Sequence, residues 1–362
     1  MIMKLPSYRQ LSEEQDAIYN LPLNKNYLIT GPPGTGKTVV ALYRASMYHK
    51  QSKRPKILSL SKLLSTYTND AAKELRINGF VGTYHSWVFQ TYQKYFGTNP
   101  PEITKYVFDW KEITPKFIER ALSDRPCLLI DEGQDLPPDF YLAATLMSEH
   151  LTVFADENQR ITQTQSSFED IKRNACISNE YQLTRNYRNT FEIAQVAACF
   201  YAGLPSGMPA PPTRRGLLPV AIKGRNLDAL VEFIIRFERN NSNLEIGIFT
   251  QRLTMQRQLE QKFKEKTRVP VSVYESTRNE LPRFGEPGIK LINYKSAKGL
   301  EFDAVFLPEL QDLGLDFSSP ENKMIFYVLL SRARQHLYLG WSGPYKPSIF
   351  SLIPDNLIEH RN

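Results

Sequence analysis

The sequence GPPGTGKT at residues 31–38 decides the fold of this chain. It follows a short apolar run at residues 27–29 and precedes a stretch of helical character that starts at Val39. Glycines in such a turn let backbone N–H groups face phosphate oxygens, and the helix N-terminus adds the positive end of its dipole. Lys37 is suited to reach the β- and γ-phosphates, and the Thr38 hydroxyl to hold Mg²⁺. The alternative is a chance glycine-rich turn, but the full pattern in this context favours a nucleoside triphosphate site.

The length and composition of the chain indicate a folded protein of two domains. With 362 residues, the chain is too long for one small core. No apolar run approaches the ~20 residues of a membrane span, and the N-terminus lacks the apolar segment of a secretory signal. We therefore expect a cytoplasmic protein with no membrane partner. The net charge of +7 suits a polyanionic partner.

Apolar, strand-like runs alternate with helix-like segments along the whole chain. Runs that are apolar on both faces are typical of buried parallel strands, and this alternation implies parallel sheets covered by helices. The expected fold class is therefore α/β, with one lobe over residues 1–180, a second over residues 181–362 and the join near residues 178–184. A small aromatic-rich insert is expected near residues 87–125 of the first lobe. The strand candidates are residues 27–30, 57–60, 127–130 and 151–155 in the first lobe, and 218–222, 246–250, 269–274, 289–292, 304–307 and 337–341 in the second.

Two carboxylates directly follow the apolar run at residues 127–130. Ligands of open α/β sheets bind at the carboxyl ends of the strands, which is where Asp131 and Glu132 are expected to lie. Asp131 is suited to hold Mg²⁺, and Glu132 to orient and deprotonate the attacking water. The alternative is a pair of solvated acids that open a loop. Together with the loop at residues 31–38, the pair predicts hydrolysis of the nucleotide.

The sequence DEGQD at residues 131–135, taken with residues 31–38, resembles the UvrD/Rep-like branch of the superfamily 1 helicases. The resemblance extends over residues 11–335 and implies two tandem RecA-like P-loop NTPase lobes that use ATP and Mg²⁺. Six further matches follow in the family's order: Gln15, GTYHS at 82–86, DENQ at 156–159, NYRNT at 186–190, KGLEF at 298–302 and YVLLSRA at 327–333.

The resemblance implies a role for each matching residue. Guanidinium groups from the second lobe would stabilise the charge of phosphoryl transfer, so the nucleotide would sit between the lobes. A surface salt bridge is the rival role for each arginine. The implied catalytic residues are Lys37, Glu132, Gln159 as γ-phosphate sensor, and Arg188 and Arg332 as arginine fingers. The implied nucleotide-binding residues are Gln15 at the adenine, Gly31, Pro32, Gly34, Thr35, Gly36, Lys37, Thr38, Tyr187, Gly299, and Glu301 at the ribose. The implied metal-binding residues are Thr38 and Asp131.

Contacts to nucleic acid are predicted at Thr83, His85, Lys62 and Lys298. Solvated helix faces are the rival interpretation for the lysines. A cluster of aromatic residues between positions 84 and 110 could stack on bases, but a small helical core is the favoured interpretation of these rings. The chain also departs from the family, because one large insert is reduced, the other is absent, and no tryptophan follows Gln159.

Two functions therefore follow from the resemblance. The first is an ATP-dependent DNA helicase or translocase acting on single-stranded DNA, with RNA left open as the strand. The alternative, which the missing inserts favour, is a nucleotide-gated ATPase subunit that regulates a partner nuclease or other effector with little unwinding.

Overall fold

The computed structural model describes residues 5–77, 80–120, 122–156, 165–203, 207–275, 282 and 284–361. The chain divides into two compact units, here called the N-terminal lobe (Leu5–Thr184) and the C-terminal lobe (Arg185–Asn362). The division lies a few residues beyond position 180, because the strand at residues 179–182 belongs to the first sheet.

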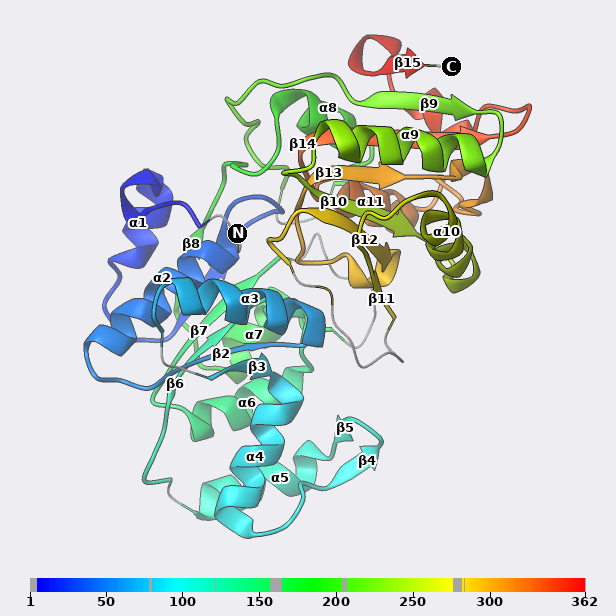
Figure 1. Cartoon of the computed structure of the whole chain (residues 1–362). Helices are drawn as coiled ribbons and strands as arrows, with labels where there is room; N and C mark the ends of the chain where they lie inside the picture. The colour runs from blue at the N-terminus through cyan, green and yellow to red at the C-terminus, as the bar shows by residue number, and fades with distance from the viewer. Residues whose placement is uncertain are drawn as a thin grey trace. The chain divides into compact units, whose positions relative to one another are not determined.

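The N-terminal lobe is built on a six-stranded parallel sheet. Figure 1 shows α2 and α3 on one face of this sheet and α4 to α7 on the other. The strand order is β3 (Phe80–Thr83), β2 (Pro55–Ser59), β6 (Cys127–Ile130), β7 (His150–Ala155), β1 (Tyr27–Thr30) and β8 (Asn179–Gln182). The helices are α1 (Glu13–Tyr19), α2 (Lys37–Lys50), α3 (Lys62–Glu74), α4 (Tyr84–Phe96), α5 (Trp110–Glu119), α6 (Pro138–Met147) and α7 (Phe168–Asn174).

The strand predictions hold best in the middle of this sheet. β1 and β6 are buried at every residue, as their apolar sequences require. The strands β3 and β8 at the two edges were missed. β8 is polar and mostly exposed, so its sequence carries no signal of burial.

Four rings of the aromatic-rich insert belong to the hydrophobic core of the N-terminal lobe. The insert consists of α4, a two-stranded hairpin of β4 (Glu102–Thr104) and β5 (Val107–Phe108), and α5. Trp87, Tyr92, Phe108 and Trp110 are buried in the same cluster as residues of the sheet. The favoured interpretation of these rings as core is therefore confirmed for those four.

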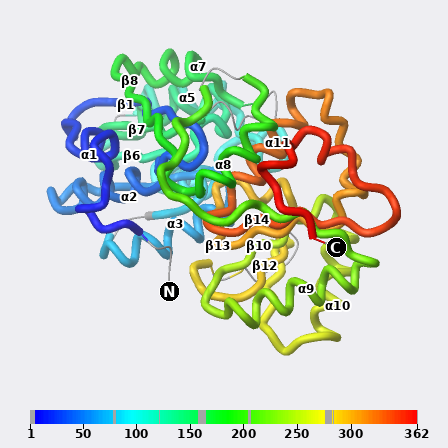
Figure 2. Tube along the Cα trace, turned by 90° about the horizontal axis from the view of Figure 1, so that it is seen from above, coloured from blue at the N-terminus to red at the C-terminus, as the bar shows by residue number. Residues whose placement is uncertain are grey.

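The C-terminal lobe is built on a seven-stranded parallel sheet. Figure 2 shows α9 and α10 on one side of this sheet and α8 and α11 on the other. The strand order is β11 (Val271–Tyr274), β12 (Gly288–Asn293), β10 (Glu245–Thr250), β13 (Phe302–Leu307), β14 (Ala333–Ser342), β9 (Val220–Gly224) and β15 (Glu359–Arg361). The helices are α8 (Phe191–Ala198), α9 (Leu227–Asn240), α10 (Leu253–Lys266) and α11 (Pro320–Leu330).

In this sheet, too, the inner strands were predicted and a polar edge strand was not. The five inner strands and the edge strand β11 overlap their predicted ranges, although β9 begins at Val220, where its pairing with β14 starts. The polar edge strand β15 was missed for the same reason as β8. The predicted fold class is confirmed: the protein consists of two RecA-like α/β lobes with parallel sheets covered by helices. Among the described residues, no helix is both long and apolar enough to cross a membrane.

Candidate active site

The predicted phosphate-binding loop connects β1 to α2. Gly36 directly precedes α2 and has a φ of 86°, a conformation that glycine adopts without strain. A Cβ atom at Gly36 would lie 2.4 Å from Nε2 of Gln15, so this position also requires glycine for space. That Nε2 atom donates a hydrogen bond of 3.0 Å to the carbonyl oxygen of Thr35. The structure therefore places Gln15, the predicted adenine contact, directly against the loop.

Lys37 is the first residue of α2 and is buried. Its Nζ donates hydrogen bonds of 2.6 Å to the carbonyl of Gly31 and 3.3 Å to that of Pro32. Nζ also lies 3.6 Å from Oδ2 of Asp156, at the end of β7. Buried charges are stable only when paired or hydrogen-bonded, and these three contacts hold the ammonium group at the mouth of the loop.

The two predicted metal ligands lie side by side. Oγ1 of Thr38 donates a hydrogen bond of 2.7 Å to Oδ2 of Asp131, although the residues are 93 positions apart in sequence. A hydroxyl and a carboxylate oxygen are ligands that Mg²⁺ accepts, and the ion usually completes its octahedron with water and phosphate oxygens. The described residues contain no cluster of three or more His, Cys, Asp or Glu side chains that could hold a metal by themselves. The pair therefore fits Mg²⁺ that is shared with a bound nucleotide.

The environment of Asp131 predicts a pH dependence of metal binding. Burial, followed by the charge of Glu132, raises the pKa of Asp131 to about 6. The carboxylate form is therefore present above that pH and is lost below it, and a protonated carboxyl is a poor metal ligand. We expect Mg²⁺ affinity, measured by calorimetric titration with a non-hydrolysable nucleotide, to fall about tenfold per pH unit below about 6. Asp131→Asn is expected to bind weakly with a flat profile, and a flat wild-type profile would contradict the assignment.

Glu132 follows β6 in a left-handed backbone conformation, with a φ of 53°. Such a conformation is uncommon for a residue other than glycine and is often found at functional sites. Oε2 of Glu132 accepts a hydrogen bond of 2.5 Å from Nε2 of Gln134, and Oε1 of Gln134 accepts one of 2.9 Å from the backbone N–H of Asp156. Gln134 is fully buried and joins the predicted general base to the end of β7.

The short turn η2 (Gly133–Asp135) also binds the chain that leads into α7. The backbone N–H of Ser166 donates to the carbonyl of Gln134 over 3.1 Å, and Nε2 of Gln165 donates to Oδ1 of Asp135 over 2.6 Å. Gln159, the predicted γ-phosphate sensor, lies outside the described residues. No role is predicted for Gln134 from the sequence. Its position in the DEGQD segment, two residues after Glu132, is the signal that could have indicated one.

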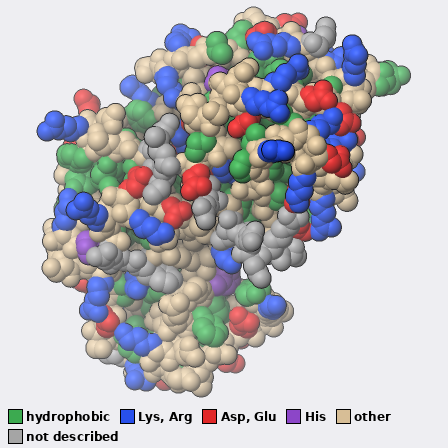
Figure 3. Space-filling view, in the orientation of Figure 1, with side chains coloured by type: hydrophobic (Ala, Val, Ile, Leu, Met, Phe, Trp, Pro, Cys, Tyr) green, Lys and Arg blue, Asp and Glu red, His purple; other side chains and the backbone are tan. Residues whose placement is uncertain are grey.

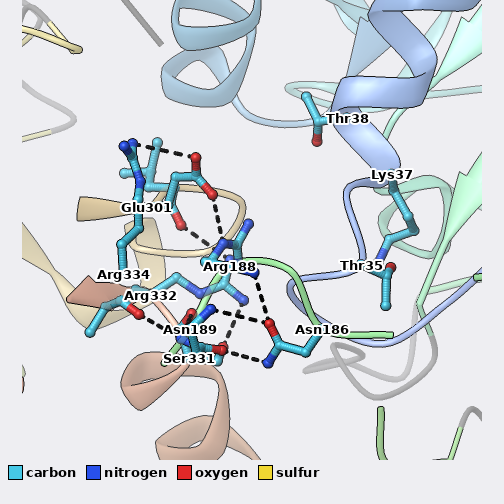
Figure 4. A network of polar contacts seen from close by, with 12 residues as sticks. Thr35, Lys37, Thr38, Asn186, Arg188, Asn189, Glu301, Ser331, Arg332 and Arg334 are labelled. Carbon is cyan, nitrogen blue, oxygen red and sulfur yellow. Dashed lines mark hydrogen bonds and ion pairs between the residues drawn. The ribbon is translucent and has the colours of Figure 1, made fainter. Parts of the chain in front are cut away.

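In the C-terminal lobe, Arg188 and Glu301 form an ion pair. Nε of Arg188 lies 2.6 Å from Oε2 of Glu301, and Nη2 of Arg334 lies 3.3 Å from the other oxygen of the same carboxylate (Figure 4). Arg334 also contacts Asp303 over 3.4 Å. The structure thus brings together the predicted first arginine finger and the predicted ribose contact. Arg334, two residues beyond Arg332, was missed.

A pair of asparagines fixes the turn that carries Arg188. Oδ1 of Asn186 accepts a hydrogen bond of 2.9 Å from the backbone N–H of Arg188. Nδ2 of Asn189 donates to the carbonyls of Ser331 and Ala333 over 3.1 and 2.5 Å (Figure 4). These bonds connect the Arg188 turn to the segment that contains Arg332.

Arg332 is almost fully buried, with 1% of its surface exposed. Its guanidinium donates hydrogen bonds to the carbonyls of Val328 and Leu300 over 2.9 and 3.3 Å, and to Oγ of Ser331 over 3.2 Å. These three bonds lie within the C-terminal lobe. The role of Arg332 as a second arginine finger stays a prediction. Its buried hydrogen bonds also give it a role in holding this part of the lobe together.

The remaining predicted residues are spread over both lobes. Tyr187 is 41% exposed, and Gly299 has a φ of 78°. In the N-terminal lobe, Lys62 begins α3 and is exposed, whereas Thr83 caps α4 through a hydrogen bond from the N–H of Ser86. Lys298, in the C-terminal lobe, lies just before Gly299 and is partly buried.

His85 is held against the hairpin of β4 and β5. Its Nε2 lies 2.8 Å from the carbonyl oxygen of Tyr106, and its ring is 3.9 Å from that of Tyr84. Burial lowers the pKa of His85 despite the bond to Tyr106, which favours the neutral ring near pH 7. If His85 contacts nucleic acid, that contact would therefore be a hydrogen bond rather than an ion pair with a phosphate.

Positive and negative charges are mixed on the face of the C-terminal lobe that carries α9 and α10. Figure 3 shows lysine and arginine side chains interleaved with aspartate and glutamate on the face that carries α9 and α10. Lys262 lies 2.9 Å from Asp228, and Lys266 lies 2.9 Å from Glu232. This face therefore lacks the single-sign patch that binds phosphate backbones.

Comparison with known proteins gives a match for each lobe. The model of the AAA domain matches residues 14–165, and that of the UvrD-like helicase C-terminal domain matches residues 222–343. No curated protein matches the sequence. Among solved structures, one similar chain is the C-terminal domain of a possible DNA helicase from Lactobacillus plantarum WCFS1. It is 22% identical, with a TM-score of 0.38, and the match covers 48% of this chain and 98% of that chain.

The loop at residues 31–38 and the two RecA-like lobes define a P-loop NTPase fold. The order of the two matched domains narrows that class, because the AAA domain is followed by a helicase C-terminal domain. The chain belongs to the UvrD-like helicases of superfamily 1.

Proposed function

We propose that the protein is an ATP-dependent helicase or translocase that acts on single-stranded DNA and hydrolyses ATP between its two lobes. The observation that carries this proposal is the juxtaposition of Thr38 with Asp131, and of Glu132 with Gln134, at the carboxyl edge of the first sheet. A phosphate-binding loop alone supports nucleotide binding. A pair of side chains suited to hold Mg²⁺, beside an oriented carboxylate, supports nucleotide hydrolysis as well.

In the proposed reaction, backbone N–H groups of the loop and Lys37 would hold the phosphates. Thr38 and Asp131 would hold Mg²⁺, which would supply positive charge to stabilise the transferred group. Glu132 takes the proton of the attacking water, and Gln134 keeps its carboxylate oriented. Arg188 and Arg332 are proposed to stabilise the transition state once the lobes close around ATP. Glu301 would exchange its bond to Arg188 for one to the ribose.

The alternative is a nucleotide-gated subunit that regulates a partner protein. It is favoured by the hairpin of β4 and β5, where Ile103, Tyr106 and Val107 are at least half exposed. Because Trp87, Tyr92, Phe108 and Trp110 are buried in the core, these four rings are unavailable to stack on bases. Exposed apolar side chains on a hairpin are suited to contact another protein.

A titration of ATPase activity separates the two functions. Turnover is measured with single-stranded DNA, duplex DNA and RNA of equal length, each at low and high salt. The proposed function requires stimulation by single-stranded DNA that weakens with salt, as phosphate contacts do. Stronger activation by RNA than by single-stranded DNA would identify RNA as the substrate. If no nucleic acid stimulates ATP turnover and a co-purified protein does, the result supports the regulatory function and contradicts the helicase or translocase function.

A further inference from the structure

The proposed reaction requires the side chain of Arg188 to change its partners. Nε of Arg188 lies 2.6 Å from Oε2 of Glu301 (Figure 4), and Nη1 is buried without a hydrogen-bond partner among the described residues. An arginine finger would leave this ion pair to meet the phosphates. Because its side-chain bonds would then be given up, the position of Arg188 has to be fixed through its backbone.

Both backbone polar groups of Arg188 are bound by side chains of the C-terminal lobe. The N–H of Arg188 donates to Oδ1 of Asn186 over 2.9 Å, and the carbonyl oxygen of Arg188 accepts a hydrogen bond from Nη2 of Arg214. The same Nη2 atom donates to the carbonyl oxygen of Arg334 over 2.6 Å. Arg188 lies just before α8, whereas Arg334 lies in β14, so Arg214 ties the Arg188 turn to the sheet.

A bulge in β14 explains why the carbonyl of Arg334 can accept this bond. Arg334 and Gln335 together oppose the single residue Asp303 of β13, and the pairing of β14 with β9 begins later, at Tyr338. A buried or half-buried backbone carbonyl that a sheet does not pair is usually satisfied by a side chain. Bulges often lie next to active sites, where they re-aim side chains. Arg214 therefore binds β14 where a neighbouring strand would otherwise do so.

Arg214 is carried by a short segment, residues 210–216, which we call the strap. The N–H of Asn186 donates to the carbonyl of Ala210 over 3.1 Å, and the N–H of Phe191 donates to the carbonyl of Arg214 over 2.8 Å. The strap thus runs beside the turn that contains Arg188. Prolines at positions 211 and 212 fix two of its φ angles, which limits its freedom to move away.

Charge attraction does not by itself explain the place of Arg214. Partial burial, followed by the charge of Arg334, lowers the pKa of Arg214, although Glu301 and Asp303 act in the opposite direction. The guanidinium nevertheless stays charged near pH 7, and a charged donor makes stronger hydrogen bonds than a neutral one. The two carbonyl oxygens are therefore the groups that Arg214 is placed to bind.

We propose that Arg214 is a positioning residue for ATP hydrolysis, which fixes the backbone of Arg188 while the side chain of Arg188 moves from Glu301 to the phosphates. The proposal rests on the proposed function and adds to it a residue that lies outside the motifs of the sequence. The alternative is that Arg214 only stabilises the C-terminal lobe. The two roles differ because a positioning residue acts through Arg188.

The first test is the variant Arg214→Met, which keeps the aliphatic stem and removes the donors. Because a small misplacement of a catalytic group is costly, kcat for ATP is expected to fall by about 10–10²-fold. The affinity for a fluorescent nucleotide should stay within about twofold of the wild type, because Lys37 and its loop are unchanged. Single-turnover hydrolysis and nucleotide fluorescence measure the two quantities.

The neighbouring arginine of the strap provides the matched control. The guanidinium of Arg215 lies 3.8 Å from the centre of the Phe191 ring and 3.6 Å from Glu192, so it anchors the strap to α8. Arg215→Met should therefore keep the turnover of the wild type. Should Arg214→Met fail to fold, Arg214→Lys keeps the charge on a shorter stem and is expected to show the same kinetic pattern with a smaller loss.

Two further measurements separate positioning from stabilisation. Adding Arg214→Met to Arg188→Ala should lower kcat no further, whereas a purely stabilising residue would add its own loss. Hydrogen–deuterium exchange without nucleotide is followed by mass spectrometry on peptides that cover residues 186–190. Exchange there should rise about tenfold in Arg214→Met and stay unchanged in Arg215→Met, because one hydrogen bond that holds the turn is lost.

Wild-type turnover in Arg214→Met, or an additive loss in the double variant, overturns the positioning role and leaves the proposed function intact. An equal loss in Arg215→Met overturns it as well, because the strap as a whole would then be needed. If the wild type hydrolyses no ATP with any nucleic acid, the proposed function fails and the role in hydrolysis fails with it. Unchanged exchange in Arg214→Met would show, independently of turnover, that Arg214 does not hold the Arg188 turn.

Discussion

Glu132→Gln is expected to lower ATP turnover by about 10²–10⁴-fold, the usual contribution of a general base. The amide keeps the shape of the carboxylate but cannot take a proton from water. ATP binding should persist, because the loop, Lys37, Thr38 and Asp131 are unchanged. Since the charge of Glu132 contributes to the raised pKa of Asp131, its removal should also favour ionised Asp131 and with it Mg²⁺.

Two measurements check this expectation. Rapid-quench single turnover gives the rate of hydrolysis, and the fluorescence of a labelled nucleotide gives affinity. Glu119→Gln, at the exposed end of α5, is the matched control and should behave as the wild type. Turnover within about tenfold of the wild type would exclude Glu132 as the general base. Loss of nucleotide binding would indicate instead that the change disrupts the loop.

The proximity of Thr38 and Asp131 could be expected from the sequence, because the loop of Thr38 follows one predicted strand and Asp131 follows another. A glycine-rich turn must follow a buried strand, and Asp131 must end another strand of the same sheet to meet Thr38. The sequence placed both strands, and the structure joins the two side chains over 2.7 Å. Parallel sheets bring such strand ends to one edge, so topology alone supplies the proximity.

Sequence could not show how these groups are held. Gln134 bonds both Glu132 and the backbone of Asp156, and this depends on the left-handed turn after β6 rather than on residue type. The edge strands β8 and β15 were missed because their mostly exposed residues lack an apolar pattern.

Arg332→Ala is expected to have two effects. If Arg332 acts as an arginine finger, its loss lowers turnover by about 10³-fold or more. The burial of its guanidinium predicts, in addition, a loss of about 1–3 kcal/mol in the free energy of unfolding, because the carbonyls of Val328 and Leu300 would lose their donor. Leu300 directly precedes Glu301, so the same bond also steadies the predicted ribose contact.

The two effects are separable by experiment. Urea unfolding gives the stability of the variant, and single-turnover hydrolysis at a temperature where it remains folded gives its chemistry. Arg236→Ala, on the exposed surface of α9, is the control for loss of an arginine. Arg332→Lys keeps the charge but lacks the planar fork that reaches three acceptors, so it should recover little of either loss. Wild-type turnover in a folded but less stable Arg332→Ala would leave Arg332 a structural role alone, and Arg188 would then be the sole arginine finger proposed for this chain.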